Sequence, residues 1–263
     1  MADSNDNWYP RNFKRAYVWE LPVRVFHWVN FLCIIVLSAT GFLISDPPAI
    51  LSNEDATSQY WFGIIRFTHF AAAYLFTAAI VMRLYWFFVG NQFARWSAYW
   101  PWTKEAIKNA KHVVWVDVML LSKKEHRLED LSIGHNSVAA FAYLMFFVLF
   151  FVMILTGFGL YAPTSEWWLP NMFAWVPSLL GGDFNTRIIH HGAMWLILII
   201  SIIHIYLVFY HEWLEGRGEV SSMFSGYKFI RAERMANTYR SPVKQESTKE
   251  VEQPAEFDPN DPC

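Results

Sequence analysis

Four long, strongly apolar stretches are the feature that most constrains how this chain can fold. No Asp, Glu, Lys or Arg lies between Arg24 and Asp46 or between Asp130 and Glu166, and two further stretches are nearly as apolar. A helix of about 20 mostly apolar residues is long enough to cross the hydrocarbon core of a bilayer. The sequence therefore predicts four membrane-spanning helices, at residues 25–44, 61–89, 136–161 and 188–211.

The composition agrees with this prediction and argues against several other classes of protein. Hydrophobic residues make up 54% of the 263 residues and charged residues only 17%, whereas soluble domains average about 25% charged residues. The net charge of −2 indicates no broad basic surface, so we expect no nucleic-acid partner. Cys33 and Cys263 form no CxxC motif, which argues against iron–sulfur and cysteine–zinc sites. The predicted fold class is an all-α membrane protein built as a four-transmembrane-helix bundle.

Lysine and arginine are distributed unevenly among the segments that flank the predicted spans. They are frequent before the first span, between the second and third, and after the fourth. Residues 45–60 contain none, and the segment between the last two spans has only Arg187. Because positive residues favour the cytoplasmic side, we predict that both termini and the middle connection are cytoplasmic. Apolar residues at helical spacing over 104–121 predict a cytoplasmic interfacial helix in that connection.

These patterns divide the chain into three parts. Residues 1–23 lack a signal-peptide pattern and are predicted to form a cytoplasmic N-terminal tail. Residues 24–230 form the predicted membrane domain, whose aromatic stretch 167–177 is too short to span and is expected at the membrane interface. Residues 231–263 are polar and acidic, and we expect a disordered cytoplasmic tail there.

Histidines fall inside the predicted spans, where ionisable residues are costly and usually functional, and four of the nine can be matched by depth. His190 and His204 are 14 residues apart, which is nearly four helical turns, so they share one helix face about 21 Å apart along the axis. By depth, His69 matches His190 near the outer side. His27 matches His204 near the cytoplasmic side.

Two facing imidazoles in a helical bundle are a typical axial ligand set for haem iron. Zinc and copper usually require three or four protein ligands at one site, whereas each depth here offers two. No CxxCH motif is present, so any haem would be b-type. The sequence predicts two b-type haems, with iron held by His69 and His190 at the outer site and by His27 and His204 at the inner site.

Other residues are weaker candidates for the haem pockets, and each has an alternative interpretation. Gly41 could leave room for a haem ring, but glycines also allow close helix packing. Arg24 and Arg66 could meet haem propionates, although Arg66 and Arg83 could instead extend toward the membrane surface. A single histidine in an apolar helix is more often a hydrogen-bonded core residue, and His191 competes with His190 as a ligand.

Four stretches of the sequence carry a family resemblance: RVFHWVNFLCIIVLSATG (24–41), GIIRFTHFAAAYLFTAAIVMRLYWFFVGN (63–91), IGHN (133–136) and RIIHHGAMWLILIISIIHIY (187–206). They resemble the b-type cytochrome subunit of membrane-bound [NiFe] uptake hydrogenases, a dihaem cytochrome b family. The resemblance covers roughly residues 17–230 and implies His27, His69, His190 and His204 as the axial ligands. The family usually shows a single histidine shortly before Met-Trp in the fourth helix, and the spacing to Met194–Trp195 favours His190 over His191.

The resemblance also implies a function in the respiratory chain. Such a subunit lies in the bacterial cytoplasmic (inner) membrane. Its partners are the hydrogenase small subunit, which has a membrane-anchoring helix of its own, and the large subunit. It passes electrons from the iron–sulfur small subunit to quinone and has no hydrogen-activating site of its own. By position alone, His135, Asn136 and Glu20 are candidates for the vicinity of the quinone.

Two alternatives stay open at this point. The chain could be the cytochrome b subunit of a formate dehydrogenase or another quinone-linked oxidoreductase. It could also be a haem-free membrane anchor in which the histidines only pack. A transporter is less consistent with the sequence, because the spans hold few polar residues and show no interrupted helix pair and no inverted repeat.

Overall fold

The structure, a computed structural model, describes residues 13–48, 60–96, 137–215 and 219–231. Among these residues, four helices are long and apolar enough to cross a membrane. The prediction of an all-α membrane protein with four spans is therefore confirmed, whereas the predicted interfacial helix at 104–121 lies outside the described residues. The four long helices are α1 (Leu21–Ser45), α2 (Trp61–Val89), α4 (Ser137–Tyr161) and α7 (Asp183–Glu215).

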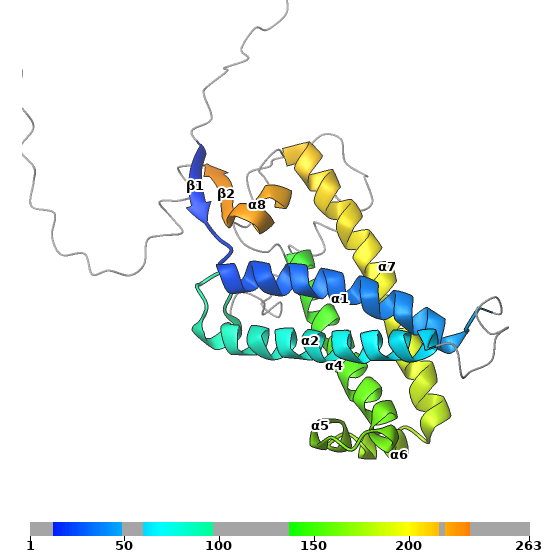
Figure 1. Ribbon diagram of the computed structural model, residues 1–263. Helices are drawn as coiled ribbons and strands as arrows, with labels where there is room; N and C mark the ends of the chain where they lie inside the picture. The colour runs from blue at the N-terminus through cyan, green and yellow to red at the C-terminus, as the bar shows by residue number, and fades with distance from the viewer. Residues whose placement is uncertain (1–12, 49–59, 97–136, 216–218, 232–263) are drawn as a thin grey trace, which may run out of the picture. The chain divides into compact units, whose positions relative to one another are not determined.

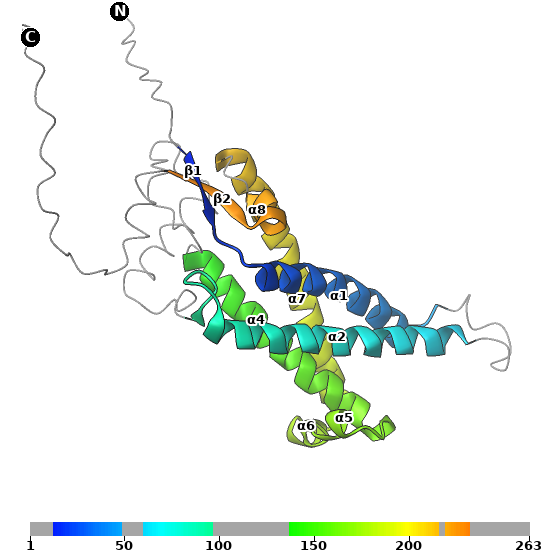
Figure 2. The ribbon, with the colours of Figure 1, turned by 60° about the vertical axis from the view of Figure 1, so that its left-hand side comes forward.

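The long helices are arranged as two pairs (Figure 1). α1 packs along α2, and α4 packs along α7. Figure 2 shows from a second direction that the α4–α7 pair crosses the α1–α2 pair at an angle.

An aromatic core connects the two pairs. The ring of Phe147 on α4 lies 6.3 Å from that of Phe26 on α1 and 5.2 Å from that of Phe87 on α2, between centroids. Phe150 meets Phe76 edge to face at 5.0 Å. Because lipid is as apolar as these side chains, close packing of the rings, and not their removal from water, stabilises the contact between the pairs.

Large apolar side chains also cover the outer surfaces of the same helices. Leu32, Phe67, Phe88 and Ile202, for example, are exposed. A soluble monomer rarely exposes apolar surface of this extent, so the outer faces fit contact with lipid.

The connection between α4 and α7 consists of short helices: η4 (Ala162–Thr164), α5 (Trp168–Asn171) and α6 (Trp175–Leu179). Trp167, Trp168 and Trp175 are exposed on it. Tryptophan is enriched where hydrocarbon meets water, so the exposed rings suit the interfacial position expected for 167–177, which stays a prediction.

A small two-stranded sheet of β1 (Phe13–Tyr17) and β2 (Tyr227–Arg231) was not expected from the sequence. Next to β2, Gly226 ends the short helix α8 (Glu219–Ser225). The Gly226 carbonyl accepts hydrogen bonds from the Val18 and Trp19 amides at 2.9 and 3.1 Å. Gly226 has φ +86°, and a Cβ there would lie 2.7 Å from the Trp19 carbonyl oxygen, so the turn requires glycine.

Polar contacts tie the start of α1 to the end of α2. The Glu20 carboxylate oxygen Oε2 accepts hydrogen bonds from the Trp86 indole Nε1–H and from the Asn91 amide, both at 2.8 Å. The Asn91 side chain in turn donates to the Val18 carbonyl at 3.0 Å. These bonds fix the relative register of the two helices at this end.

Arg83, near the same end of α2, is fully buried and does not extend toward the membrane surface as one interpretation of the sequence allowed. Its Nε donates to the Tyr143 hydroxyl at 2.6 Å and its Nη1 to the Ala94 carbonyl at 3.2 Å. The guanidinium also lies 4.3 Å from the centre of the Phe87 ring. Neutral acceptors and aromatic faces thus satisfy a buried positive charge between α2 and α4.

Removal of the Tyr143 hydroxyl should destabilise the packing of α2 against α4. Tyr143→Phe leaves the ring in place but deprives a buried charged donor of an acceptor, which typically costs about 1.5–3 kcal/mol. We expect lower thermal stability of the detergent-purified protein. Tyr85→Phe is the control, because the Tyr85 side chain is 61% exposed. Equal stability of the Tyr143→Phe and Tyr85→Phe proteins would contradict this role for Arg83.

Candidate haem-binding site

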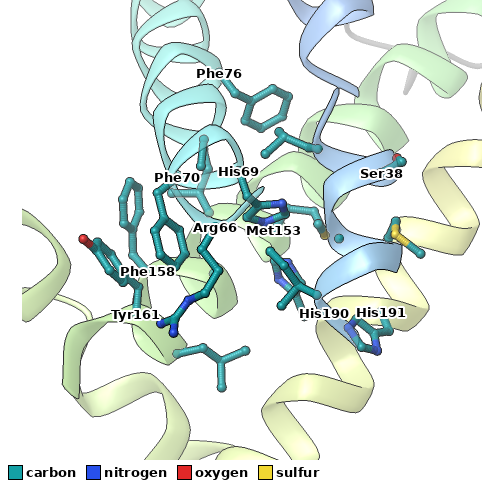
Figure 3. A pocket seen from close by; sticks show the side chains of 18 of the residues that line it. Ser38, Arg66, His69, Phe70, Phe76, Met153, Phe158, Tyr161, His190 and His191 are labelled. Atoms are coloured by element: carbon teal, nitrogen blue, oxygen red, sulfur yellow. The ribbon is translucent and has the colours of Figure 1, made fainter. Parts of the chain in front are cut away.

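A cavity of about 420 Å³ lies among the four long helices. His69 of α2 and His190 of α7 both line it, and Figure 3 shows their rings close to one another. The volume falls in the range of about 300–1,000 Å³ that is usual for small-molecule and cofactor pockets. The structure thus brings together the two histidines that the sequence predicted at the outer depth.

A threonine on the neighbouring helix holds the His69 ring. Thr40 Oγ1 lies 2.9 Å from His69 Nδ1 and 2.6 Å from the Val36 carbonyl oxygen one turn earlier in α1. A carbonyl can only accept, so the hydroxyl proton of Thr40 is directed to Val36. The Thr40 oxygen therefore accepts from the His69 Nδ1–H.

His190 has the same arrangement with the other helix pair. Thr156 Oγ1 on α4 lies 2.8 Å from His190 Nδ1 and 2.6 Å from the Val152 carbonyl oxygen. By the same reasoning, Nδ1 of His190 carries the proton and donates it to Thr156. In both imidazoles Nε2 then holds the lone pair, which is the form of histidine that binds a metal.

A glycine follows each threonine and makes room for the ring. A Cβ added at Gly41 would lie 3.6 Å from His69 Cε1, and one at Gly157 would lie 3.2 Å from His190 Cε1. The first distance is an ordinary contact, whereas the second is tight. Gly41 lines the cavity and borders His69 there, while its predicted contact with a haem stays a prediction.

Two arginines lie on the lining of the same cavity. Arg66 is exposed, with its guanidinium 5.8 Å from the centre of the Phe70 ring, and Figure 3 shows that this group points away from the His69 ring. Arg187, at the start of α7, lines the cavity as well. Positive charge at the edge of an apolar cavity suits a ligand that is apolar in its body and carboxylated at one side.

His191 also lines the cavity but differs from His190. Its side chain is exposed, and its ring centroid lies 6.4 Å from that of His190. In Figure 3 the His191 ring points away from His69. Of the two neighbours, His190 thus has the threonine contact and the position beside His69.

The inner histidines are less enclosed. His27 lies on α1 and His204 on α7, and the side chain of His204 is exposed. Nδ1 of His27 is buried and has no hydrogen-bond partner within the described part of the chain. His27 thus differs from His69 and His190, whose Nδ1 atoms each meet a threonine hydroxyl.

Arg24 lies one turn before His27 and contacts α8. Its Nη1 donates to the Phe224 carbonyl, while its Nε is buried with no partner in the described ranges. Its predicted contact with a propionate stays a prediction.

Of the three residues predicted near the quinone, the structure describes only Glu20. His135 and Asn136 lie outside the described residues. Glu20 is described, but its Oε2 already accepts the two hydrogen bonds from Trp86 and Asn91. Its role toward quinone stays a prediction.

The set of ligands in the described ranges suits haem better than a bare metal ion. No three His, Cys, Asp or Glu side chains gather there in a way that could hold a metal ion. A haem needs only two axial ligands from the protein, and the outer cavity supplies two.

Sequence reasoning missed Thr40 and Thr156 and did not assign Arg187 to the site. One signal could have found the threonines: a Thr-Gly pair occurs both at 40–41 and at 156–157, in two different spans.

Comparison with known proteins supports the same family. The model of the family described as prokaryotic cytochrome b561 matches residues 18–226. A relative from Cupriavidus necator, named probable Ni/Fe-hydrogenase B-type cytochrome subunit, is 37% identical, with 84% of this chain and 90% of the relative covered. A relative from Escherichia coli K12, named probable Ni/Fe-hydrogenase 1 B-type cytochrome subunit, is 33% identical, with 88% and 97% covered. The resemblance seen in the motifs is confirmed, and the chain belongs to the prokaryotic cytochrome b561 family.

Proposed function

We propose that this chain is a dihaem b-type cytochrome that anchors a [NiFe] hydrogenase to the bacterial cytoplasmic membrane and passes its electrons to quinone. The family implies b-type haem, and the relatives described above are named as Ni/Fe-hydrogenase subunits. The observation that carries the proposal is the pair His69 and His190, two oriented imidazoles with Nε2 available in one cavity.

The residues of the outer cavity fit a haem. His69 and His190 would be its axial ligands, and Gly41 and Gly157 keep side chains away from the two rings. Arg66 and Arg187 would pair with the propionates, since guanidinium and carboxylate form strong charge-assisted hydrogen bonds. Apolar side chains such as Ile34 and Phe76 complete the lining.

His27 and His204 would hold the second haem toward the cytoplasmic side. α7 would supply one ligand to each site, His190 and His204, so a single helix would set the separation of these two ligands at about 21 Å along its axis. Arg24, one turn from His27, would contact a propionate of this inner haem.

A haem bound between two imidazoles supplies a one-electron carrier whose iron has no open position for a substrate. The protein contributes the orientation of the ligands and the exclusion of lipid and water. With both termini cytoplasmic, electrons would enter at the outer site from the hydrogenase small subunit. They would leave at the inner site to quinone, near Glu20, His135 and Asn136.

The pairing of the histidines predicts a specific pattern of haem loss. His69→Ala and His190→Ala should each remove the same haem, so the double variant should still retain about one haem per chain. His69→Ala combined with His204→Ala should retain none. Haem quantified per polypeptide in purified protein measures this, and His191→Ala should keep both haems. Full haem content in the His204→Ala protein would rule out the inner pair.

The two glycines provide a graded test of the outer site. Gly157→Ala places a methyl group 3.2 Å from the His190 ring, whereas Gly41→Ala places one at an ordinary 3.6 Å from the His69 ring. We expect Gly157→Ala to weaken haem retention at the outer site and Gly41→Ala to change it little. Haem remaining after successive detergent washes measures the difference. The reverse order of the two variants would contradict the contacts described here.

Hydrogen-dependent reduction tests the proposed function itself. In native membranes with active hydrogenase, hydrogen should reduce the haem of this chain, and added quinone should reoxidise it. His204→Ala should abolish the reoxidation by quinone. Haem that stays oxidised under hydrogen, while the hydrogenase reduces an artificial acceptor, would assign this cytochrome to another oxidoreductase. Purified protein without haem would indicate that the chain is a haem-free membrane anchor.

A further inference from the structure

We propose that Thr40 and Thr156 are a matched pair of positioning residues that lock His69 and His190 as Nδ1–H tautomers and thereby set the potential of the outer haem. This inference rests on the proposed function, because it takes His69 and His190 as the axial ligands.

The hydroxyl geometry fixes which atom donates. Each threonine lies 2.6 Å from the carbonyl oxygen one turn earlier, Val36 or Val152, so its only proton is committed to that bond. What each hydroxyl offers the neighbouring imidazole is an oxygen lone pair, at 2.9 Å for His69 and 2.8 Å for His190.

The two contacts share one arrangement. In each helix pair, one helix supplies the Thr-Gly dipeptide and the other supplies the histidine. Thr40 of α1 contacts His69 of α2, and Thr156 of α4 contacts His190 of α7. Both threonines are buried, Thr40 at 9% and Thr156 at 2% exposed, so no water replaces the hydroxyl. The glycine that follows each threonine borders the same ring at Cε1, so that the backbone can lie close enough for the hydrogen bond.

Two threonines of α2 show that the contact is not a general consequence of a hydrogen bond to the preceding turn. Thr68 and Thr77 of α2 also donate to the carbonyl four residues earlier, at 2.8 Å each. Neither forms a hydrogen bond with an imidazole among the described residues. The contacts of Thr40 and Thr156 with imidazoles therefore depend on the positions of these two hydroxyls, which lie next to Nδ1 of His69 and Nδ1 of His190.

The chemical consequence concerns the other ring nitrogen. A hydrogen bond accepted from Nδ1–H fixes the tautomer, orients the ring and makes Nε2 a stronger donor to iron. A stronger donor stabilises ferric over ferrous iron, so loss of the bond should move the haem midpoint potential in the positive direction. Two such bonds on one iron should act in the same sense.

The test replaces each hydroxyl by a methyl group of the same shape. Thr40→Val and Thr156→Val should each shift one of the two haem midpoints to more positive potential, and together they should shift it further. The affinity of that site for haem should fall by about 10- to 100-fold, as found for other partners that hold metal ligands. Thr40→Ser and Thr156→Ser, which keep the hydroxyl, should restore both values. Thr68→Val is the matched control and should change neither haem.

Redox titration, the low-spin ferric EPR signals and haem content are all measured on the purified full chain. Should the valine variants fail to assemble, Thr→Ala at the same positions removes the same hydroxyls. Valine variants with wild-type midpoints and EPR signals would overturn the inference, provided that His69→Ala loses a haem. Both haems retained in His69→Ala and His190→Ala would instead overturn the ligand assignment, and this inference with it.

Discussion

A polar side chain inside a bilayer has to find its hydrogen-bond partner within the protein, because the hydrocarbon offers none. In this chain that constraint produces a small number of polar contacts between helices, each of them between different long helices of the bundle. The Thr40 hydroxyl forms a hydrogen bond with His69 and the Thr156 hydroxyl forms one with His190. The Tyr143 hydroxyl accepts a hydrogen bond from the buried Arg83 guanidinium. These contacts orient side chains that an apolar core alone would leave free to rotate.

The aromatic core and the polar contacts have separate roles. Phe26, Phe76, Phe147 and Phe150 pack the two helix pairs against each other. Beside this core, the four helices leave a cavity that His69 and His190 line together with apolar and aromatic side chains such as Ile34 and Phe70. The same four helices thus form both a closely packed core and a cavity, and the cavity carries the ligands of the proposed outer haem.

Much of this could be predicted from the sequence, because long charge-free segments and the depth of histidines follow directly from the membrane. The four spans were predicted correctly, and the structure brings His69 and His190 together. Thr40 and Thr156 were missed for a physical reason: threonine back-bonds are ordinary in membrane helices, and which hydroxyl meets a ring depends on the rotation of each helix. The burial of Arg83 likewise depends on tertiary contacts of its guanidinium: hydrogen bonds to Tyr143 and Ala94 and packing on the Phe87 ring. The short sheet and its Gly226 turn lie outside the periodic segments from which the fold was predicted.

The central claim is that this chain holds two b-type haems, each between two histidines. The most direct test is the amount of haem b per polypeptide in the wild-type protein purified in mild detergent, measured as the pyridine haemochrome against amino-acid analysis. The account predicts two haems per chain with a b-type reduced-minus-oxidised spectrum. One haem per chain would contradict one of the two histidine pairs, and protein without haem would contradict both.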